Sequence, residues 1–326
     1  MSRAGVRIQI LFAACVAVAA LLVAPAGAGA ATVVNGDFET GNLTGWQVFN
    51  LPPEPENSGS WFAYTGTASP FEEGPEVPPP PAGNFAAITA QGGQGTHILY
   101  QDVALEPYWT HQLSLLVYYH SFAPLATPSP ETLDNGIPAA NQQYRVDVMK
   151  PTASPESVNP EDILATVFAT KTGDPEELGP TPITVDLTPF AGQTVRLRFA
   201  EVDNEFFFAA GADSISIQST PPSSAFTQGK PVFNKKKGTA KLPVTVPGAG
   251  TLTIADVKAT KKRVKTKTLQ LTAGGTVNLP VKPTKSARKT LKAKGKLKVK
   301  VSVTFTPTGG TAAAQTRKLT LKLAPK

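Results

Sequence analysis

Residues 296–305 alternate strictly between polar and apolar side chains, a pattern that few folds accommodate. Apolar residues occupy every second position from Leu297 to Phe305, and lysine, serine or threonine fills the positions between them. Side chains of a β-strand point alternately to opposite faces, whereas this order would scatter apolar groups around a helix. The segment therefore predicts an antiparallel strand with one buried face and one cationic face.

Other segments indicate strands of the same kind, because they are rich in β-branched and aromatic residues and partly alternate. They are residues 113–119, 143–149, 195–200, 214–218, 240–246, 251–254, 264–271, 277–281 and 318–323. No stretch keeps a helical period long enough to compete, although residues 285–294 fit either a short basic helix or a loop. The chain is therefore predicted to be all-β, built from sandwiches or barrels.

Proline-rich stretches interrupt this pattern at residues 51–82, 123–138 and 151–182. Proline cannot donate to a β-ladder, so these stretches are predicted to be long surface loops. They would either carry function or merely decorate the surface.

Charge divides the chain at one point. Residues 32–225 hold five Lys and Arg against 23 Asp and Glu, whereas residues 226–326 hold 24 against a single acid, Asp256. A proline-serine segment at the break is typical of a linker. We predict a first domain at 31–220, a linker at 221–226 and a basic domain at 227–326. About seven strands in the latter favour an immunoglobulin-like β-sandwich.

The N-terminus predicts a cleaved signal helix at residues 1–30. Arg3 and Arg7 precede an apolar run at 8–23, and small residues follow up to Ala30. The run of about sixteen residues is shorter than the roughly twenty that span a bilayer, which disfavours a membrane anchor. The protein is therefore predicted to be extracellular, secreted or cell-surface associated, with no transmembrane segment after signal cleavage. The sole cysteine, Cys15, lies in the run, so the mature chain lacks thiols.

Four segments occur in the order found in a known fold: 33–46 (VVNGDFETGNLTGW), 99–103 (LYQDV), 190–199 (FAGQTVRLRF) and 213–217 (DSISI). Together they resemble galactose-binding-like jelly-roll domains, the superfamily of many bacterial carbohydrate-binding modules. The resemblance implies an N-terminal jelly-roll β-sandwich. Residues 238–252 and 303–310 resemble a C-terminal module of exported proteins from high-GC Gram-positive bacteria, for which it implies no ligand.

The jelly-roll resemblance also implies a structural Ca²⁺ where the first and last strands meet. By position, its side-chain candidates are Asp37, Glu39 and Asp213. Calcium takes six to eight oxygen ligands, so carboxylates on two neighbouring strands suit it. Ser214 stands where the family usually has a second acid, which removes one ligand. The alternative is that these acids are solvated residues at strand ends.

Glycan binding, which the resemblance also implies, needs exposed aromatic rings that stack on sugars. The candidates are Trp61, Tyr64, Tyr118 and His120, and the alternative for each is packing in the core or a loop. Trp46 is predicted to be a core residue that pins the opening loop onto the sandwich.

The sequence carries no recognisable catalytic motif. His97, His111 and His120 form neither HExxH nor a close metal-binding spacing, and no serine lies in GxSxG. Acid pairs at 72–73 and 176–177 fall in the proline-rich stretches, where solvated charge is the simpler interpretation. We therefore predict a protein that is not an enzyme. A convergent pair of buried carboxylates would favour the enzyme alternative.

The basic domain predicts an anionic partner through long-range, salt-sensitive attraction. For an exported protein the available polyanions are wall polymers and lipid headgroups. Nucleic acid is not predicted, because the domain has few aromatic residues for base stacking. The sequence thus favours a secreted, non-catalytic carbohydrate-binding or surface-adhesion protein whose partner is a glycan or anionic wall polymer. The alternatives are a structural envelope protein without a glycan ligand, a glycan-active enzyme, or a lysine-rich face that only maintains solubility.

Overall fold

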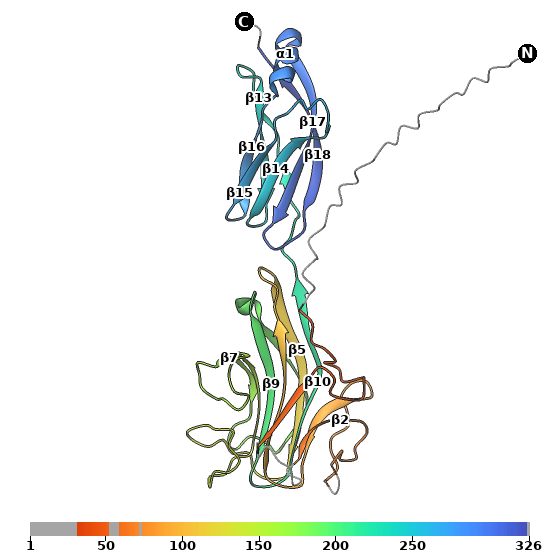
Figure 1. Cartoon of the computed structure of the whole chain (residues 1–326), viewed down its shortest axis with the longest axis vertical. Helices are drawn as coiled ribbons and strands as arrows, with labels where there is room; N and C mark the ends of the chain where they lie inside the picture. The colour runs from red at the N-terminus through yellow and green to blue at the C-terminus, as the bar shows by residue number, and fades with distance from the viewer. Residues whose placement is uncertain (1–30, 52–58, 72–73, 325–326) are drawn as a thin grey trace, which may run out of the picture.

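The computed structural model describes residues 31–51, 59–71 and 74–324. The predicted signal helix and Cys15 lie outside the described residues. Apart from one α-helix and one 3-10 turn, the regular elements are strands, so the chain is all-β, as its patterning predicts. Strands before and after residues 221–226 form separate sheets (Figure 1).

The first domain is a sandwich of two five-stranded antiparallel sheets. One sheet has the order β1-β4-β9-β6-β7 and the other β2-β3-β10-β5-β8. The strands are β1 (Gln47–Leu51), β2 (Ser60–Tyr64), β3 (Ala86–Ala90), β4 (Gly95–Ala104), β5 (Thr110–Ser121), β6 (Gln143–Met149), β7 (Ile163–Ala169), β8 (Glu177–Asp186), β9 (Thr194–Asp203) and β10 (Phe208–Thr220). The 3-10 turn spans Thr188–Phe190.

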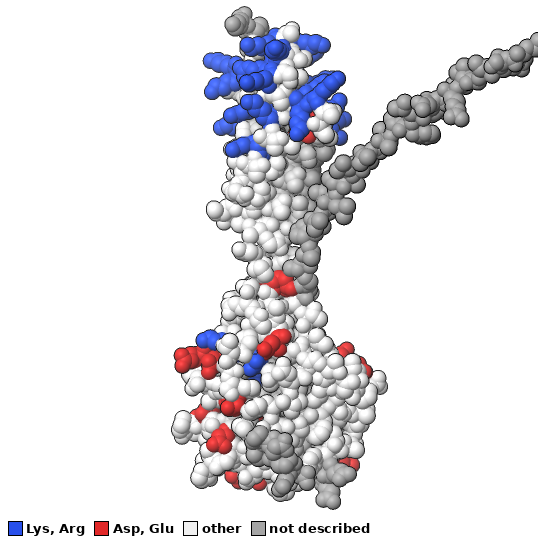
Figure 2. Space-filling view, viewed as in Figure 1, with Lys and Arg blue, Asp and Glu red and all other residues white. Residues whose placement is uncertain are grey.

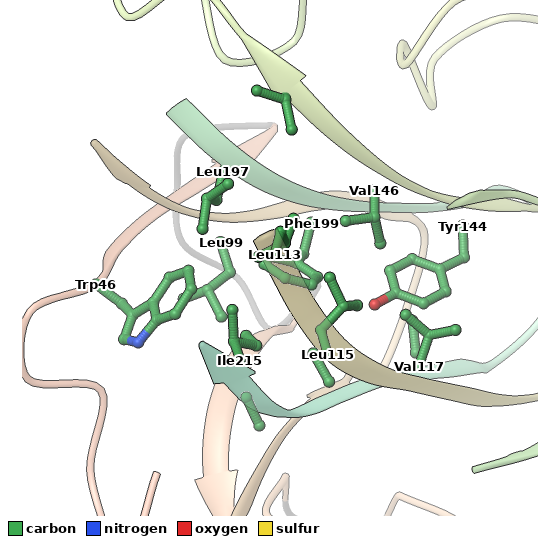
Figure 3. Close-up of a cluster of buried hydrophobic side chains, with 14 of the residues drawn as sticks. Trp46, Leu99, Leu113, Leu115, Val117, Tyr144, Val146, Leu197, Phe199 and Ile215 are labelled. Carbon is green, nitrogen blue, oxygen red and sulfur yellow. The ribbon is translucent and has the colours of Figure 1, made fainter. Parts of the chain in front are cut away.

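Alternate residues of facing strands fill the space between these sheets. Leu99 of β4 and Leu197 and Phe199 of β9 project inward to meet Leu113 of β5 (Figure 3). Trp46 closes this core, with its ring centroid 5.7 Å from that of Phe199. Its indole N–H donates to a backbone carbonyl of the opening loop. The predicted core role of Trp46 is therefore confirmed.

The predicted loop at 151–182 is wrong in part, because β7 and the start of β8 lie inside it. Pro180 and Pro182 are part of β8. Both strands occupy sheet edges, where one side of the ladder makes no hydrogen bonds and proline is tolerated. Similarly, β2 lies inside the stretch 51–82 and is also an edge strand.

The second domain is a smaller antiparallel sandwich. One sheet has the order β11-β13-β12 with β16 also on β13, and the other has the order β15-β14-β17-β18. The strands are β11 (Thr227–Gln228), β12 (Val232–Asn234), β13 (Thr239–Val246), β14 (Gly250–Asp256), β15 (Lys267–Leu271), β16 (Gly275–Val281), β17 (Lys296–Pro307) and β18 (Ala313–Lys322). In β17 the alternating residues are buried and exposed as predicted.

Residues 285–294, left open between helix and loop by the sequence, form the helix α1 (Lys285–Lys294). Thr284 caps its N-terminus by accepting a hydrogen bond from Ala287 N, which satisfies a backbone donor of the first turn. Gly295 ends it in the left-handed region at φ 63°. Ala287 and Leu291 attach α1 to the core, so its lysines face solvent.

A contact between the domains lies beside the linker. The indole N–H of Trp109 donates to the carbonyl oxygen of Gly309 over 2.9 Å. Gly309 has φ 75°, and a Cβ there would come within 2.9 Å of Tyr108 Cβ. Only glycine therefore permits this approach without a backbone shift.

Candidate functional site

Three of the four predicted glycan-binding residues are buried. Trp61 is only 2% exposed, and its indole N–H donates to the His97 carbonyl oxygen over 2.9 Å. Tyr64 and Tyr118 are also buried, with their hydroxyl oxygens 2.8 Å apart. Burial raises the pKa of both phenols. The expectation of exposed rings at these three positions is therefore wrong, because large aromatic residues serve a core as well as a binding surface.

His120 is half-buried, and its ring stacks on Phe122 with centroids 4.2 Å apart. It lies on β5 next to the buried Tyr119, whose side chain enters the sandwich. Its glycan-binding role stays a prediction.

The predicted calcium ligands hold a loop against the strands. Asp213 Oδ2 accepts a hydrogen bond from Ala82 N over 3.1 Å, and Glu39 Oε1 accepts from Asn84 N and Phe85 N over 2.7 and 2.9 Å. These backbone donors lower the pKa of Glu39. Burial raises the pKa of Asp213 to about 6, and the charges of Glu39 and Asp37 add to this rise. The hydrogen bonds that Asp213 accepts from the backbone of Ser214 and Ala82 oppose it. Asp37, Glu39 and Asp213 do not form a group whose ligand atoms all lie within 4.8 Å of one another, and a Ca²⁺ site at these residues stays a prediction.

A tighter group of donor side chains lies elsewhere in the first domain. In the described residues, His97, Glu201 and Asp203 form the group of acids and imidazoles whose ligand atoms all lie within 4.8 Å of one another. All three residues are buried. In the antiparallel pairing of β4 and β9, His97 lies opposite Glu201 and Gly95 lies opposite Asp203. This register brings together groups about a hundred residues apart in the sequence.

The sequence interpretation missed this group. Its one local signal is a pair of acids, Glu201 and Asp203, two positions apart at the end of a strand, so that their side chains point to the same face. That face is the interior, because Leu197 and Phe199 share it. The partner, His97, is identified only once the register of the two strands is known.

The imidazole of His97 has a defined orientation. Its Nδ1 lies 3.1 Å from Asn50 Oδ1, while the amide nitrogen of Asn50 donates to Ser60 Oγ. An amide oxygen only accepts, so Nδ1 of His97 carries the proton of this hydrogen bond. A Cβ on Gly95 would lie 2.3 Å from Nε2. Glycine therefore leaves the space in which the imidazole tips toward the carboxylates.

Burial makes the carboxylate charges unfavourable. Among the described residues neither oxygen of Glu201 has a hydrogen-bond partner, and Asp203 Oδ1 has none either. Burial, and then the neighbouring Asp203, raise the pKa of Glu201 well above its ordinary value. Burial raises the pKa of Asp203 to about 8, although hydrogen bonds from Gln91 and Gly95 oppose the shift. The pair needs either protons or a cation.

A second buried charge cluster, by contrast, is already compensated. Asp147 accepts from Arg145 Nε over 2.7 Å and from Arg198 Nη2 over 2.5 Å, and Arg198 also donates to the carbonyls of Pro155 and Ser157. Burial alone would raise the pKa of Asp147, but these hydrogen bonds and charges outweigh it and lower the pKa. The cluster therefore pins the 155–157 loop onto the sheet.

In the second domain, the lysines of β17 and β18 border a basic groove, defined here by Lys258, Arg263, Lys298, Lys300 and Lys318. It encloses a cavity of about 440 Å³. A neighbouring cavity of about 530 Å³ shares Arg263 and Lys298. Figure 2 shows Lys and Arg gathered over the part of this domain that carries α1.

Among the described residues no acidic side chain forms an ion pair with the cations of this groove, because the ion pairs all lie in the first domain. The one acid of the groove, Asp256, accepts hydrogen bonds from the backbone N–H groups of Lys258 and Arg263. Across the β17–β18 pairing, Lys300 lies opposite Lys318, and Lys296 opposite Lys322. Like charges in such positions destabilise a sheet, so the groove is suited to an external anion.

No protein-family model matches the sequence, and none of the curated proteins compared with it matches. The comparison with solved structures gives matches of low similarity. A Stig cyclase from Fischerella sp. TAU has 16% identity and a TM-score of 0.35 and covers 60% of this chain and 99% of its own. The K3 cleaved adhesin domain of Lys-gingipain from Porphyromonas gingivalis W83 has 15% identity and a TM-score of 0.35, and covers 57% and 98%.

The adhesin domain of Epf from Streptococcus pyogenes covers 90% of this chain and 97% of its own, with 11% identity and a TM-score of 0.30. At such low scores and identities no ligand or activity carries over to this chain. Among the described residues, no helix is long and apolar enough to cross a membrane.

Proposed function

We propose that the chain is a secreted, non-catalytic surface-adhesion protein whose basic domain binds an anionic wall polymer of the cell envelope. The observation that carries the proposal is the unneutralised basic groove, in which lysines face one another across β17 and β18. A polymer with repeated phosphate or carboxylate groups would relieve this repulsion. The lysine ammonium is a flexible, strongly hydrated point charge. It therefore suits such an irregular polymer better than an arginine, whose guanidinium favours a fixed bidentate geometry.

The first domain would then be displayed to other ligands. We propose that it is a galactose-binding-like jelly roll that binds a glycan, with Ca²⁺ at Asp37, Glu39 and Asp213 holding its strand ends together. The order of its motifs supports this class, and His120, unlike the other three predicted glycan-binding residues, is only half-buried. The burial of the other three aromatic residues directs a search for the glycan contacts to other surfaces.

The buried carboxylates Glu201 and Asp203 are the feature that would favour an enzyme. Both side chains are buried in the interior of the first sandwich, with Glu201 0% and Asp203 2% exposed. A glycan in solution therefore has no access to them. This observation favours binding over glycan chemistry.

The test is a co-sedimentation assay of mature chain, residues 31–326, with purified cell walls at low salt. Lys298→Glu with Lys300→Glu should weaken binding on the order of tenfold, because both residues line the groove. Lys150→Glu with Lys171→Glu changes the net charge equally, but on exposed residues of the first domain, and should leave binding close to wild type. Equal losses of binding in both variants would mean that the interaction depends only on net charge, and would contradict a specific role for the basic groove.

A glycan array probed with the same chain, with and without Ca²⁺, tests the first domain separately. Calcium-dependent retention that Asp213→Asn removes would support the proposed jelly-roll site. Glycan binding that is unaffected by chelation and by Asp213→Asn would contradict a role for Ca²⁺ in holding the binding surface.

A further inference from the structure

The His97, Glu201 and Asp203 group has features of an assembled ligand site rather than of an incidental meeting of polar residues. The β4–β9 register sets His97 beside Glu201, and Asp203 follows two residues along the same inward face. Their ligand atoms lie within 4.8 Å of one another. Rigid strands in the middle of a sheet thus fix three donor groups around one point.

Glu201 supplies the independent sign that a ligand belongs there. Its side chain is fully buried, and among the described residues both of its oxygens lack a hydrogen-bond partner. Folded proteins very rarely leave a buried carboxylate without a partner, because the desolvation penalty is large. In this sandwich the compensated Asp147 shows the usual solution, with two arginines around one carboxylate. Among the described residues, no arginine or lysine forms an ion pair with Glu201 or Asp203.

The imidazole is oriented for coordination. His97 Nδ1 lies 3.1 Å from Asn50 Oδ1, and Nε2 lies where a Cβ on Gly95 would stand, the residue opposite Asp203 in the β4–β9 pairing. Metal-ligating histidines in proteins characteristically donate their other ring N–H to an oxygen in this manner. The asparagine is itself held by Ser60. The group therefore has both its ligands and a residue that positions one of them.

The donor set selects the class of cation. Calcium and magnesium favour all-oxygen sites, whereas one imidazole nitrogen with two carboxylates suits Zn²⁺ and related divalent transition metals. A divalent ion also balances the two carboxylate charges within the buried site. We propose that His97, Glu201 and Asp203 bind a divalent transition metal ion, best matched by Zn²⁺, inside the first sandwich. The site is separate from the predicted calcium ligands and does not depend on the proposed function.

The first experiment measures zinc binding by the mature chain after a chelator has been applied and removed. Isothermal titration with ZnCl₂ should give one equivalent bound at this site. The melting temperature of the first domain should rise by about 5–10 °C when free zinc is about a hundredfold above Kd. X-ray absorption of the zinc complex should show only nitrogen and oxygen ligands. Absence of binding and of any thermal shift in the wild-type chain would overturn the proposal in favour of a protonated carboxylate pair.

Variants separate this site from adventitious binding. Glu201→Gln and Asp203→Asn keep side-chain shape and remove buried charge, so both should fold and both should lose the zinc-dependent shift. Gly95→Ala inserts a methyl group where the imidazole Nε2 lies and should lower affinity by about 10–100-fold. His120→Ala removes a histidine of β5 that is not part of the group on β4 and β9, and this variant should bind zinc like wild type. Wild-type affinity in Glu201→Gln and Asp203→Asn would contradict the site even if the chain binds zinc.

Discussion

The two domains place their polar groups in opposite locations. Among the described residues, every buried polar or charged side chain lies in the first domain, between Thr89 and Asp213, whereas the second domain buries none. The second domain instead displays its cations on strand faces and on α1. The first sandwich thus buries polar and charged side chains in its interior. The second has an apolar interior and carries its charges on the surface.

This difference indicates where each domain gains its specificity. An interior ionic group has few degrees of freedom and needs a matched partner, because an unpaired buried charge is strongly unfavourable. A solvated lysine has little effect on stability and acts at a distance. We therefore expect mutations of interior charges to alter the folding of the first domain, and mutations of surface charges to alter the binding of the second.

The largest expected effect is the loss of Asp147, which leaves Arg145 and the fully buried Arg198 without their shared carboxylate. Asp147→Ala should lower the free energy of unfolding of the first domain by about 3–5 kcal/mol. Asp256→Ala in the second domain removes hydrogen bonds from the backbone N–H groups of Lys258, Arg263 and Val264 but leaves no buried charge unpaired, so it should cost about 1 kcal/mol, like a lost cap. Denaturant unfolding measures both, and equal losses would contradict the contrast.

The second domain should depend on its apolar core instead. Leu242 is fully buried on β13, and Leu242→Ala should lower the free energy of unfolding by about 3 kcal/mol through lost burial and a residual cavity. Lys298→Ala, on the exposed face of β17, should change it by less than about 0.5 kcal/mol. Thermal unfolding of the two variants tests this. A larger loss from Lys298→Ala would mean that the lysines stabilise the domain.

The stability of the first domain should depend on acidic pH through Asp147. The pKa of Asp147 is lowered in the folded state, so the folded domain binds fewer protons than the unfolded chain near the ordinary aspartate pKa of about 4. The stabilisation is complete above that pH and is lost as the pH falls through the folded-state pKa. Asp147→Asn should flatten the acid limb of the first domain's unfolding profile, recorded by circular dichroism. An unchanged limb would show that other carboxylates dominate.

Salt should act in opposite directions on the stability and the binding of the second domain. Raising the ionic strength from about 0.01 M to about 0.15 M shortens the screening length from about 30 to about 8 Å. The repulsion between Lys300 and Lys318 weakens, so the stability of the domain should rise by a few tenths of a kcal/mol, roughly the size of one cross-strand pair. Polymer binding should weaken over the same range. A fall in stability would contradict an unneutralised groove.

The sequence allowed the second domain to be predicted more fully than the first. The alternation in β17 set which residues are buried, and the basic residues could only lie on the other face. In the first domain the same reasoning located β5, β6, β9 and β10 but not the other strands, among them the edge strand β8, which contains Pro180 and Pro182. Local pattern gives the period of a strand, whereas its place in a sheet depends on the long-range pairing.

The candidate sites show the same limit. A tryptophan such as Trp61 carries identical local signals whether it lies in a core or on a binding surface, and only the packing of the sandwich decides. The contact of His97 with Glu201 follows from strand register, for which no local sequence signal exists. The basic groove was predictable in kind, because composition alone requires 24 cations to be accommodated on a small domain.

The most direct test of the division between the domains is amide hydrogen exchange of the mature chain with and without a soluble anionic wall polymer. The account predicts slower exchange in the peptides that contain Lys298, Lys300 and Lys318, and unchanged exchange in β4 and β9. Slower exchange in the first domain with none along β17 and β18 would contradict it.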